Sequence, residues 1–504
     1  TPNLTILQGE AGQVLTQNGK VCGVRTTFGE IISARAVVLA TGVYLKSAVI
    51  AGEFKQSSGP NGFAPANELT DNLIELGFRV RRFKTGTPAR VDGRTIDYSK
   101  CELQPGDPNV YPFSFLSDHV PQIQKPCYLT YTNERTHEII RANLHRSPLY
   151  SGVIKGTGPR YCPSIEDKVV RFADKERHQL FLEPECADSN EVYVQGMSSS
   201  LPHDVQRAMY RTVAGLENVR IMRYAYAIEY DCIDTLDVYP TLEFKKVEGL
   251  YTAGQINGTS GYEEAAAQGL IAGLNASLKL RGMPPLILHR DEAYIGVLID
   301  DLVTKGTNEP YRMMTSRAEH RIRLRQDNAD LRLTQKGYDA GLATQERYEK
   351  LQERKRALER IGRQLEERVP PAKCSEFLQS RGFPAPAGGV SYADMLRRGI
   401  PIEDIRREYA ILNGERAADI ETACIGIKYE GYLKRGLEQI ERAKKLEDRK
   451  LPEDIDYEKI SGLRLEARQK LNKIRPENLG QAGRISGVNP ADIAVLMVYL
   501  SLNK

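Results

Sequence analysis

A thiol lies among cations in residues 158–172, which read GPRYCPSIEDKVVRF. Cys162 stands between Arg160 and Lys168, and Pro163 follows it directly. Nearby cations and a helix that begins just after the thiol would both lower the thiol pKa and favour the thiolate. Such a thiol suits a nucleophile or a proton-transfer group. A structural cysteine in a tight turn is the alternative, and the residues alone leave it open.

A glycine-rich loop in residues 250–275 is a candidate cofactor site. An apolar strand stub leads into Gly254, Gly258 and Gly261, and an Ala-rich helix begins near Tyr262. The three glycines can take positive φ and let another group approach the backbone closely. The helix N-terminus offers free N–H groups and a positive dipole end to an anionic or carbonyl-bearing cofactor. A tight strand–helix junction in an α/β sheet explains the same residues equally well.

A second glycine signature, Ala-Val-Val-Leu-Ala-Thr-Gly at residues 36–42, favours the cofactor interpretation. A buried strand ending in Ala-Thr-Gly resembles a signature of flavoproteins with two dinucleotide-binding domains, so the pair resembles a FAD-binding domain. No GxGxxG follows a strand, and residues 156–161 lack the third glycine. We therefore expect the first βαβ unit to be missing from this sequence, the natural protein to be longer at its N-terminus, and this fragment to bind FAD poorly.

Two basic clusters could contact phosphates. Arg312, Arg317 and Arg321 stand near one face at helical spacing, in a window that also holds Arg323, Arg325 and Arg332. Arginine forks bind phosphate groups in pairs of hydrogen bonds. A solvated, salt-bridged face is the alternative, because Glu319, Asp327 and Asp330 lie in the same window. The second cluster, KTGTPAR at residues 84–90, offers Lys84 and Arg90 beside a glycine turn.

Composition indicates a globular protein without a resident metal. The 504 residues suggest about three domains, and a net charge of +4 leaves polyanion binding to local clusters. The eight cysteines are scattered without zinc spacing, so we expect free thiols in a reducing compartment and no metal site. No run of eighteen apolar residues occurs, so we expect no membrane partner and a cytoplasmic location.

The pattern of elements predicts an α/β fold: a discontinuous Rossmann-like FAD-binding domain, an inserted α/β domain and an all-α C-terminal domain. We expect the FAD-binding domain in residues 1–80 and 236–284. Residues 81–235 form the inserted α/β domain. Residues 285–504 form the helical C-terminal domain, because strand signals vanish from about Pro285 onward.

Individual elements follow from local signals. The strands are expected at residues 4–7, 14–15, 21–26, 30–34 and 37–40, with an Asn18-Gly19 hairpin turn. The helices are expected at residues 67–76, 344–367 and 429–446. A terminal apolar helix at residues 491–502 should pack partly on residues 463–471 and partly on a partner.

Several long motifs now occur together and in order along the chain. They are KTGTPAR (84–90), TNERTHEIIRANLHRSP (132–148), GPRYCPSIEDKVVRFADKERHQLFLEPE (158–185), GMSSSLPHDVQ (196–206), YAIEYD (226–231), AGQINGTSGYEEAAAQG (253–269), PYRMMTSRAEHR (310–321), DNADLRL (327–333) and KYEGYL (428–433). Over essentially its whole length the chain closely resembles the tRNA uridine carboxymethylaminomethyl modification enzymes, the GidA/MnmG family.

The resemblance implies a FAD-dependent enzyme that modifies C5 of the wobble uridine of tRNA. It implies a cytoplasmic homodimer that joins a tRNA-modifying GTPase of the MnmE/TrmE type in a heterotetramer. It implies NADH as hydride donor and methylenetetrahydrofolate as one-carbon donor, with glycine or ammonium as the amine. A flavin supplies redox chemistry that no side chain can perform.

The resemblance also implies roles for particular residues. Cys162 matches the functional cysteine, Gln255 matches a FAD contact, and Ala11 falls near a FAD backbone contact. Ala66 stands where the family can have Ser, in the loop at residues 59–67. The nicotinamide segment comprises Gly158, Pro159, Arg160, Tyr161, Pro163, Ser164, Ile165, Glu166, Asp167, Lys168, Val169, Val170, Arg171 and Phe172. Positions tied to tRNA binding are Arg160, Lys168, Arg312 and Arg321. We expect Arg317, Lys84 and Arg90 to face tRNA phosphates as well. The resemblance implies that residues 81–235 lie on the nicotinamide and substrate side and that residues 285–504 bind tRNA and the GTPase.

Two other functions compete. A folate- and FAD-dependent tRNA uracil-C5 methyltransferase shares the flavin domain, but the long helical tail and KYEGYL at residues 428–433 argue against it. A non-catalytic RNA-binding or assembly protein is the alternative from another class, because the dinucleotide fingerprint is absent.

Overall fold

The computed structural model describes residues 2–107, 110–117, 120, 125–160, 163–452 and 454–502. The chain divides into two compact units. The first comprises Thr1–Val110, Pro121–Ile287 and Leu298–Met313, and the second comprises Tyr111–Val120, Leu288–Val297 and Met314–Lys504.

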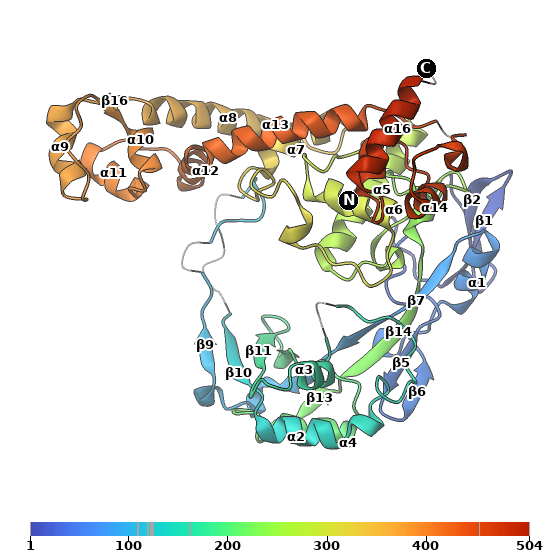
Figure 1. The fold of residues 1–504 in the computed structure, drawn as a ribbon. Coiled ribbons are helices and arrows are strands. Elements are labelled where there is room, and N and C mark those ends of the chain that lie inside the picture. Colours follow the sequence, from blue (N-terminus) through green and yellow to red (C-terminus); the bar gives the residue numbers. More distant parts are fainter. Residues whose placement is uncertain are drawn as a thin grey trace. The chain divides into compact units, whose positions relative to one another are not determined.

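The first unit contains the expected discontinuous flavin-type domain (Figure 1). Strand β4 (Val37–Leu39) pairs in parallel with β15 (Leu250–Thr252), although about two hundred residues separate them in sequence. Helix α5 (Tyr262–Leu280) follows β15. A parallel pair needs a long crossover connection, and here the inserted domain lies within it. The α/β fold with a Rossmann-like core is therefore confirmed.

An antiparallel sheet flanks this core. Strands β1 (Ala11–Gln17), β2 (Lys20–Thr26) and β3 (Ile31–Ser33) pair in chain order, and α1 (Asn67–Glu75) packs on β1. The turn at Asn18 and Gly19 has φ of 53° and 75°, which suits a two-residue hairpin. The strand expected at residues 4–7 is wrong. Those residues are exposed coil, and no described strand supplies a ladder partner.

Two antiparallel sheets form the inserted part. One has the order β6-β5-β14-β7 and the other β13-β8-β12-β11-β10-β9. The strands are β5 (Ala48–Ala51), β6 (Phe54–Ser57), β7 (Val80–Thr87), β8 (Arg90–Asp92), β9 (Glu102–Gln104), β10 (Cys127–Tyr131), β11 (Gln179–Pro184), β12 (Glu191–Gln195), β13 (Ile221–Arg223) and β14 (Tyr226–Ile233). Helices α2 (Glu134–Ala142) and α4 (His203–Tyr210) lie side by side in Figure 1, and α3 (Ile165–Arg171) packs on α2. Their apolar faces share one core with the six-stranded sheet.

The second unit is helical. Its helices are α7 (Ala329–Asp339), α8 (Gln345–Leu365), α9 (Pro371–Gln379), α10 (Tyr392–Arg397), α11 (Ile402–Tyr409), α12 (Ala417–Lys428), α13 (Glu430–Glu447), α14 (Leu465–Ile474), α15 (Leu479–Arg484) and α16 (Pro490–Leu502). Helix α6 (Tyr294–Lys305) runs across the division between the units. The expectation that strands vanish is wrong in one place: β16 (Arg368–Val369) pairs with β17 (Val390–Ser391).

The long charged helix α8 begins where a cap is available. Its N-cap Thr344 accepts a hydrogen bond from the backbone N–H of Arg347, which satisfies one free donor of the first turn. At the other end of the chain, α14, α15 and α16 enclose one apolar core that includes Leu471, Leu479 and Leu496. The expected packing of the terminal helix on residues 463–471 is therefore confirmed.

Candidate flavin and nicotinamide sites

The two glycine signatures meet at one sheet edge. Gly42 lies just beyond β4 with φ of 55°, and a Cβ added to it would stand 4.0 Å from Oε1 of Gln255, just beyond β15. Both loops therefore leave the carboxyl ends of neighbouring parallel strands. Open α/β sheets bind their ligands at this position.

The glycine loop 254–261 requires glycine for two different reasons. Gly254 and Gly258 have φ of 84° and 74°, in the left-handed region. A Cβ on Gly258 would also stand 2.8 Å from Oγ1 of Thr307 and 2.9 Å from Cε2 of Phe83. Gly261 does not use its freedom to take positive φ, because its φ is an extended −129°. A Cβ there would collide with the Glu264 carboxylate at 1.7 Å, so close approach explains this glycine.

Gln268 on α5 fixes the loop from behind. Its Oε1 accepts hydrogen bonds from the Gly254 N–H at 3.2 Å and from Asn257 Nδ2 at 2.8 Å. Its Nε2 donates to Thr259 Oγ1 at 3.0 Å, and that hydroxyl donates to the Gly254 carbonyl at 3.0 Å. Gln268 is fully buried, so these bonds are shielded from water. In the sequence, only the position of Gln268 about two turns into an Ala-rich helix points to this role.

Polar atoms at this edge remain available for a cofactor. Buried oxygens without a partner in the described structure include Thr41 Oγ1, Thr252 Oγ1, Asn257 Oδ1 and Thr307 Oγ1. Buried polar groups are normally hydrogen-bonded, so such a cluster points to a ligand or to water. The N-terminus of α5 has no side-chain cap, and Tyr262 in its first turn is 94% exposed. These residues fit the polar edge of an isoalloxazine and its ribityl chain.

Ala66 and Ala11 occupy different positions in the first unit. Ala66 lies beside the loop after Gly42: its N–H donates to the Tyr44 carbonyl at 2.8 Å, and it forms a parallel bridge with Leu45. It is therefore close to the second glycine signature. Ala11 opens β1 opposite Thr26.

The segment that leads into the nicotinamide candidate is fixed to β7. The buried Glu229 carboxylate accepts hydrogen bonds from the N–H groups of Lys155 and Gly156, both at 2.7 Å. Burial raises the pKa of Glu229, but these hydrogen bonds and the Arg82 charge outweigh it, so the pKa is lowered. The Lys84 N–H then donates to the Thr157 carbonyl at 3.0 Å.

Helix α3 begins where the sequence predicts a helix start. Ser164 is its N-cap and accepts from the Asp167 N–H at 3.3 Å. Ile165, Glu166 and Val169 are buried, and Val170, Arg171 and Phe172 are exposed. Gly158 and Pro159 are half-buried and Arg160 is exposed, while Lys168 donates to the Gly196 carbonyl at 3.2 Å. Tyr161 and Cys162 lie outside the described residues.

Two of the expected phosphate contacts are not available at the surface of the first unit, because Lys84 is buried and Arg90 is already paired. Lys84 is only 7% exposed and points into a small hollow, so it is not available at the surface. The Arg90 guanidinium pairs with Glu185 at 2.7 Å and covers the Tyr193 ring at 4.6 Å.

The helical spacing proposed for Arg312, Arg317 and Arg321 is wrong. Residues 312–314 carry no helix, and only a three-residue 3₁₀ turn covers Thr315–Arg317. Tyr311 pairs with the glycine loop through a backbone bridge to Thr259, which keeps this segment extended. Arg312 accordingly donates to the Ser260 carbonyl at 2.9 Å, beside the flavin loop. Arg317 is half-buried and Arg321 is exposed.

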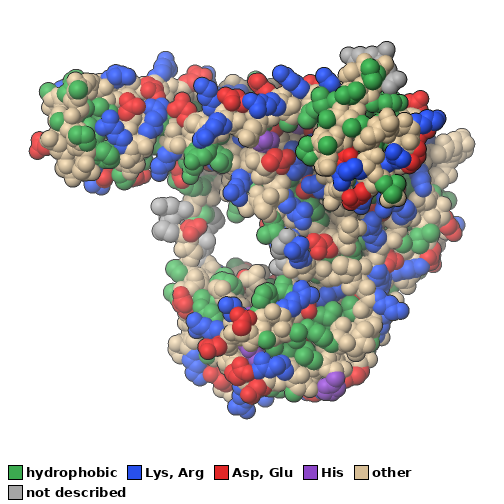
Figure 2. All heavy atoms as spheres, viewed as in Figure 1, with side chains coloured by type: hydrophobic (Ala, Val, Ile, Leu, Met, Phe, Trp, Pro, Cys, Tyr) green, Lys and Arg blue, Asp and Glu red, His purple; other side chains and the backbone are tan. Residues whose placement is uncertain are grey.

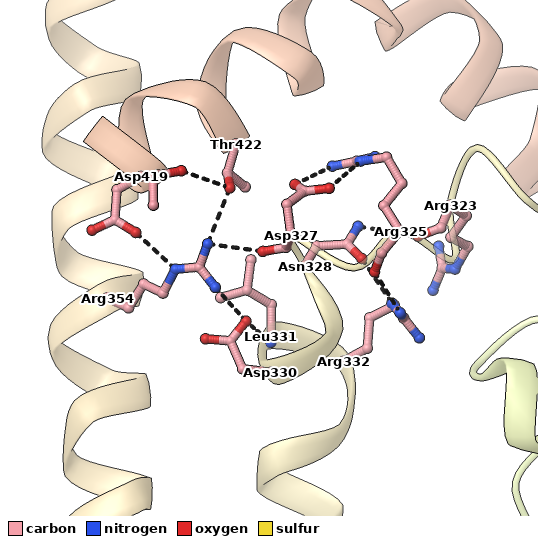
Figure 3. A network of polar contacts seen from close by, with 11 residues as sticks. Arg323, Arg325, Asp327, Asn328, Asp330, Leu331, Arg332, Arg354, Asp419 and Thr422 are labelled. Carbon is pink, nitrogen blue, oxygen red and sulfur yellow. Dashed lines mark hydrogen bonds and ion pairs between the residues drawn. The ribbon is translucent and has the colours of Figure 1, made fainter. Parts of the chain in front are cut away.

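The other arginines of this window are structural (Figure 3). Arg325 forms two bonds to Asp327, at 2.8 and 3.1 Å, and Arg332 donates to Asn328 at 3.0 Å. Along α8 and α13 of the second unit, Lys and Arg side chains alternate with carboxylates rather than forming a patch of one sign (Figure 2). Arg325 is therefore salt-bridged within the protein, as the alternative to phosphate binding predicts. The mixture of positive and negative side chains on this surface is consistent with that alternative.

Among the described residues, no group of three or more His, Cys, Asp or Glu side chains is arranged to hold a metal ion. Within that same part of the chain, no helix is both long and apolar enough to cross a bilayer. Seven of the cysteines are described, and each is a free thiol.

Three family models match this chain, over residues 1–284, 345–437 and 439–504. The model named glucose inhibited division protein A matches residues 1–284. Two models described as the C-terminal helical domain and the C-terminal helical bundle of the tRNA modifying enzyme MnmG/GidA match residues 345–437 and 439–504.

Individual relatives agree over nearly the whole chain. The tRNA uridine 5-carboxymethylaminomethyl modification enzyme MnmG of Caldicellulosiruptor saccharolyticus is 57% identical, covering 100% of this chain and 81% of that protein. The enzyme of the same name from Clostridium kluyveri is 55% identical over 99% of this chain and 80% of its own length. The structure of Aquifex aeolicus GidA in its form II crystal superposes with a TM-score of 0.88 at 45% identity, covering 99% of this chain and 80% of that chain.

A discontinuous dinucleotide-binding core with an inserted α/β part and a helical C-terminal region defines the class of FAD-dependent tRNA-modifying enzymes. The chain belongs to the MnmG/GidA family.

Proposed function

We propose that this enzyme modifies C5 of the wobble uridine of tRNA with FAD, adding an aminomethyl or carboxymethylaminomethyl group. The observation that carries the proposal is the meeting of the Gly42 and Gln255 loops at the carboxyl ends of β4 and β15. The printed names of the relatives give the reaction class.

The residues of the glycine loop would hold the flavin. Gly254 and Gln255 lie at the end of β15, and the free N–H groups of the first turn of α5 face the same edge. When bound, the flavin supplies the redox step that moves a hydride and a one-carbon unit. The positive end of α5 stabilises negative charge near the ring, and the buried hydroxyls at this edge hydrogen-bond its polar atoms.

Residues 158–172 would bind NADH, and methylenetetrahydrofolate would supply the carbon. Support comes from the rigid attachment of this segment to β7 and Glu229 and from the N-cap of α3. Cys162 would add to the pyrimidine or transfer the proton at C5. Arg160, Lys168, Arg312, Arg317 and Arg321 would contact the tRNA. A GTPase of the MnmE/TrmE type would bind the helical end of a homodimer, giving a heterotetramer in the cytoplasm.

Nucleoside mass spectrometry of tRNA tests the proposal. Cells that lack this protein should lose the modified wobble uridine, and the natural full-length gene should restore it. Cys162→Ser should fail to restore it while leaving FAD and tRNA binding largely intact. An unchanged nucleoside content in the deletion strain would contradict the function, whereas restoration by Cys162→Ser would remove only the cysteine from the chemistry.

A further inference from the structure

A small hollow lies on the opposite face of β7 from the flavin loop. Phe83 touches Gly258 on one face of the strand, and the next residue, Lys84, points to the other face because strand side chains alternate. The hollow has room for about one water molecule (about 10 Å³). Lys84, Pro159, Ser164, Ser198, Ser199 and Ser200 line it.

Lys84 is buried without a counter-ion. It is 7% exposed, and no hydrogen bond or ion pair joins its ammonium to a residue that the structure describes. A Cβ on Gly158 would stand 2.6 Å from Lys84 Cε, so the glycine lets the lysine chain pass toward the hollow. A buried cation without a partner is costly, which favours an anion beside it.

Glu166 lies close but does not pair with Lys84. Its Oε1 accepts from the Ser200 N–H at 2.9 Å and from the Ser200 hydroxyl at 3.3 Å, while its buried Oε2 has no described partner. Burial raises the pKa of Glu166, and the Ser200 hydrogen bond and the Lys84 charge oppose that rise only in part. The Glu166 oxygen that has a described partner is therefore directed at Ser200 and not at the Lys84 ammonium.

Ser198, Ser199 and Ser200, which line the hollow, are fixed by backbone and side-chain hydrogen bonds. The Ile165 N–H donates to the Ser198 carbonyl at 2.8 Å, and the Gly52 N–H donates to the Ser200 carbonyl at 2.7 Å. Ser199 Oγ accepts from the Leu201 N–H at 3.1 Å. The hollow is therefore fixed from three separate segments of the first unit.

We propose that this hollow is a subsite for one anionic oxygen of a ligand, a carboxylate or phosphate oxygen, bound by the Lys84 ammonium and the surrounding serine hydroxyls. The inference deepens the proposed function, because residues 158–172 bind the ligand that carries this oxygen. It replaces the earlier assignment of Lys84 to the tRNA backbone. Glu166 acts as a positioning residue that orients Ser200.

Titration of the full-length protein with lysine side chains labelled by ¹⁵N tests the subsite directly. Inorganic phosphate and formate are added separately, and the Lys84 ammonium signal is identified by its loss in Lys84→Met. We expect one of the two anions to shift that signal at saturation, and the effective anion distinguishes phosphate from carboxylate. No shift with either anion would overturn the subsite, whether or not the enzyme binds NADH.

Ligand affinities then identify the source of the oxygen. Lys84→Met should weaken the binding of either NADH or methylenetetrahydrofolate by roughly 10- to 100-fold, because a hydrogen bond to a charged group is lost. Ser200→Ala should cause a smaller loss for the same ligand and provides the readout if Lys84→Met does not fold. Glu166→Gln should weaken the binding of that ligand less than Lys84→Met does, because glutamine keeps the oxygen that accepts from Ser200.

The matched control is Glu183→Gln. Glu183 is another carboxyl group whose pKa is raised, by burial and by Glu185, but it does not line the hollow. An equal loss of affinity in Glu183→Gln and Lys84→Met would contradict the subsite. A loss in Glu166→Gln as large as in Lys84→Met would show that Glu166 and Lys84 form an internal ion pair instead.

Discussion

The conformation of the flavin loop depends on individual glycines. At Gly258 a side chain would require both a left-handed backbone and space that Thr307 and Phe83 already occupy. Gly269, only eleven residues later, lies on the exposed face of α5 with no atom within 4 Å of an added Cβ. A side chain is therefore excluded at Gly258 and can be accommodated at Gly269.

Gly258→Ala should lower the free energy of unfolding by about 2 kcal/mol and weaken FAD binding. Gly269→Ala should raise the free energy of unfolding by up to about 1 kcal/mol, because alanine is the better helix former. Chemical denaturation and a flavin absorbance titration measure the two effects. Equal changes in the free energy of unfolding and in FAD affinity for the two variants would show that the loop does not need the left-handed conformation at Gly258.

Arg321 is the arginine of its window best suited to contact RNA. It is exposed and forms no ion pair with the residues described here. Arg321→Ala should weaken tRNA binding and reduce the slope of log affinity against log salt by about 1. Arg407→Ala removes a charge from α11 and should leave the slope unchanged. A slope that stays the same in Arg321→Ala would assign this arginine to the protein's own surface.

At the scale of elements, one buried arginine joins three helices of the second unit. Arg354 on α8 donates to Asp419 at 2.7 Å and to Thr422 at 3.0 Å, both on α12 (Figure 3). It also donates to Asp330 on α7 and to the Asp327 carbonyl at 2.8 Å. Arg354 and both carboxylates are less than a tenth exposed.

Arg354→Met should lower the free energy of unfolding of the second unit by about 3–5 kcal/mol, because two buried carboxylates lose their cation. Arg360→Met, on the same helix, removes the ion pair between an exposed guanidinium and the half-buried Glu415 and should lower the free energy of unfolding far less. Urea denaturation followed by far-UV circular dichroism compares them. Similar losses in the two variants would contradict the importance of burial.

The C-terminal bundle should be sensitive to acid through Asp492. Arg464 pairs with this buried carboxylate at 2.7 Å, and its hydrogen bond holds the pKa of Asp492 below the usual value. Because the folded-state pKa is the lower one, the stabilisation is complete above the unfolded-state value of about 3.9 and is lost as pH falls through the folded-state pKa. Asp492→Asn should cost about 2 kcal/mol at pH 7. The difference from the wild type should shrink in acid, as thermal unfolding at several pH values would show; a constant difference would exclude this ionisation.

The sequence predicted those elements whose signals are local. The Asn18-Gly19 turn, the helix expected at residues 344–367 and the start of α3 each depend on neighbouring residues, and all three are confirmed. The predictions that were wrong concern residues whose conformation depends on contacts with residues far away in the sequence. Residues 4–7 have strand composition but no ladder partner, and Tyr311 holds residues 312–314 out of a helix by bridging to Thr259. The burial of Lys84 needed the position of Gly158, which no local pattern provides.

At the scale of the whole molecule, α16 is the candidate surface for the GTPase. Val498 and Leu502 are 59% and 78% exposed, whereas Leu496 is buried in the core with α14 and α15. Deleting residues after Pro476 would remove α15 and α16 and uncover that core, so a truncation cannot separate binding from folding. Point substitutions on the exposed face are the sharper test.

The double variant Val498→Ser with Leu502→Ser should lose GTPase capture in a pull-down while keeping its thermal stability, because it removes apolar contact area without opening the core. Leu465→Ser serves as control, since this leucine of α14 is also 67% exposed. Normal capture by the double variant would place the GTPase interface on another surface.

The parallel pairing of β4 with β15 sets an order for events on the ribosome. Val37 pairs with Leu250, so the strand must wait until more than two hundred further residues have been translated. At about 5–20 residues per second, that delay is on the order of 10 to 40 seconds. Strands β7 and β14 pair earlier, because Ile233 emerges before Leu250. The inserted sheets can therefore assemble first and bring the two halves of the flavin core together, and the nascent chain exposes an unpaired apolar strand to chaperones throughout the interval.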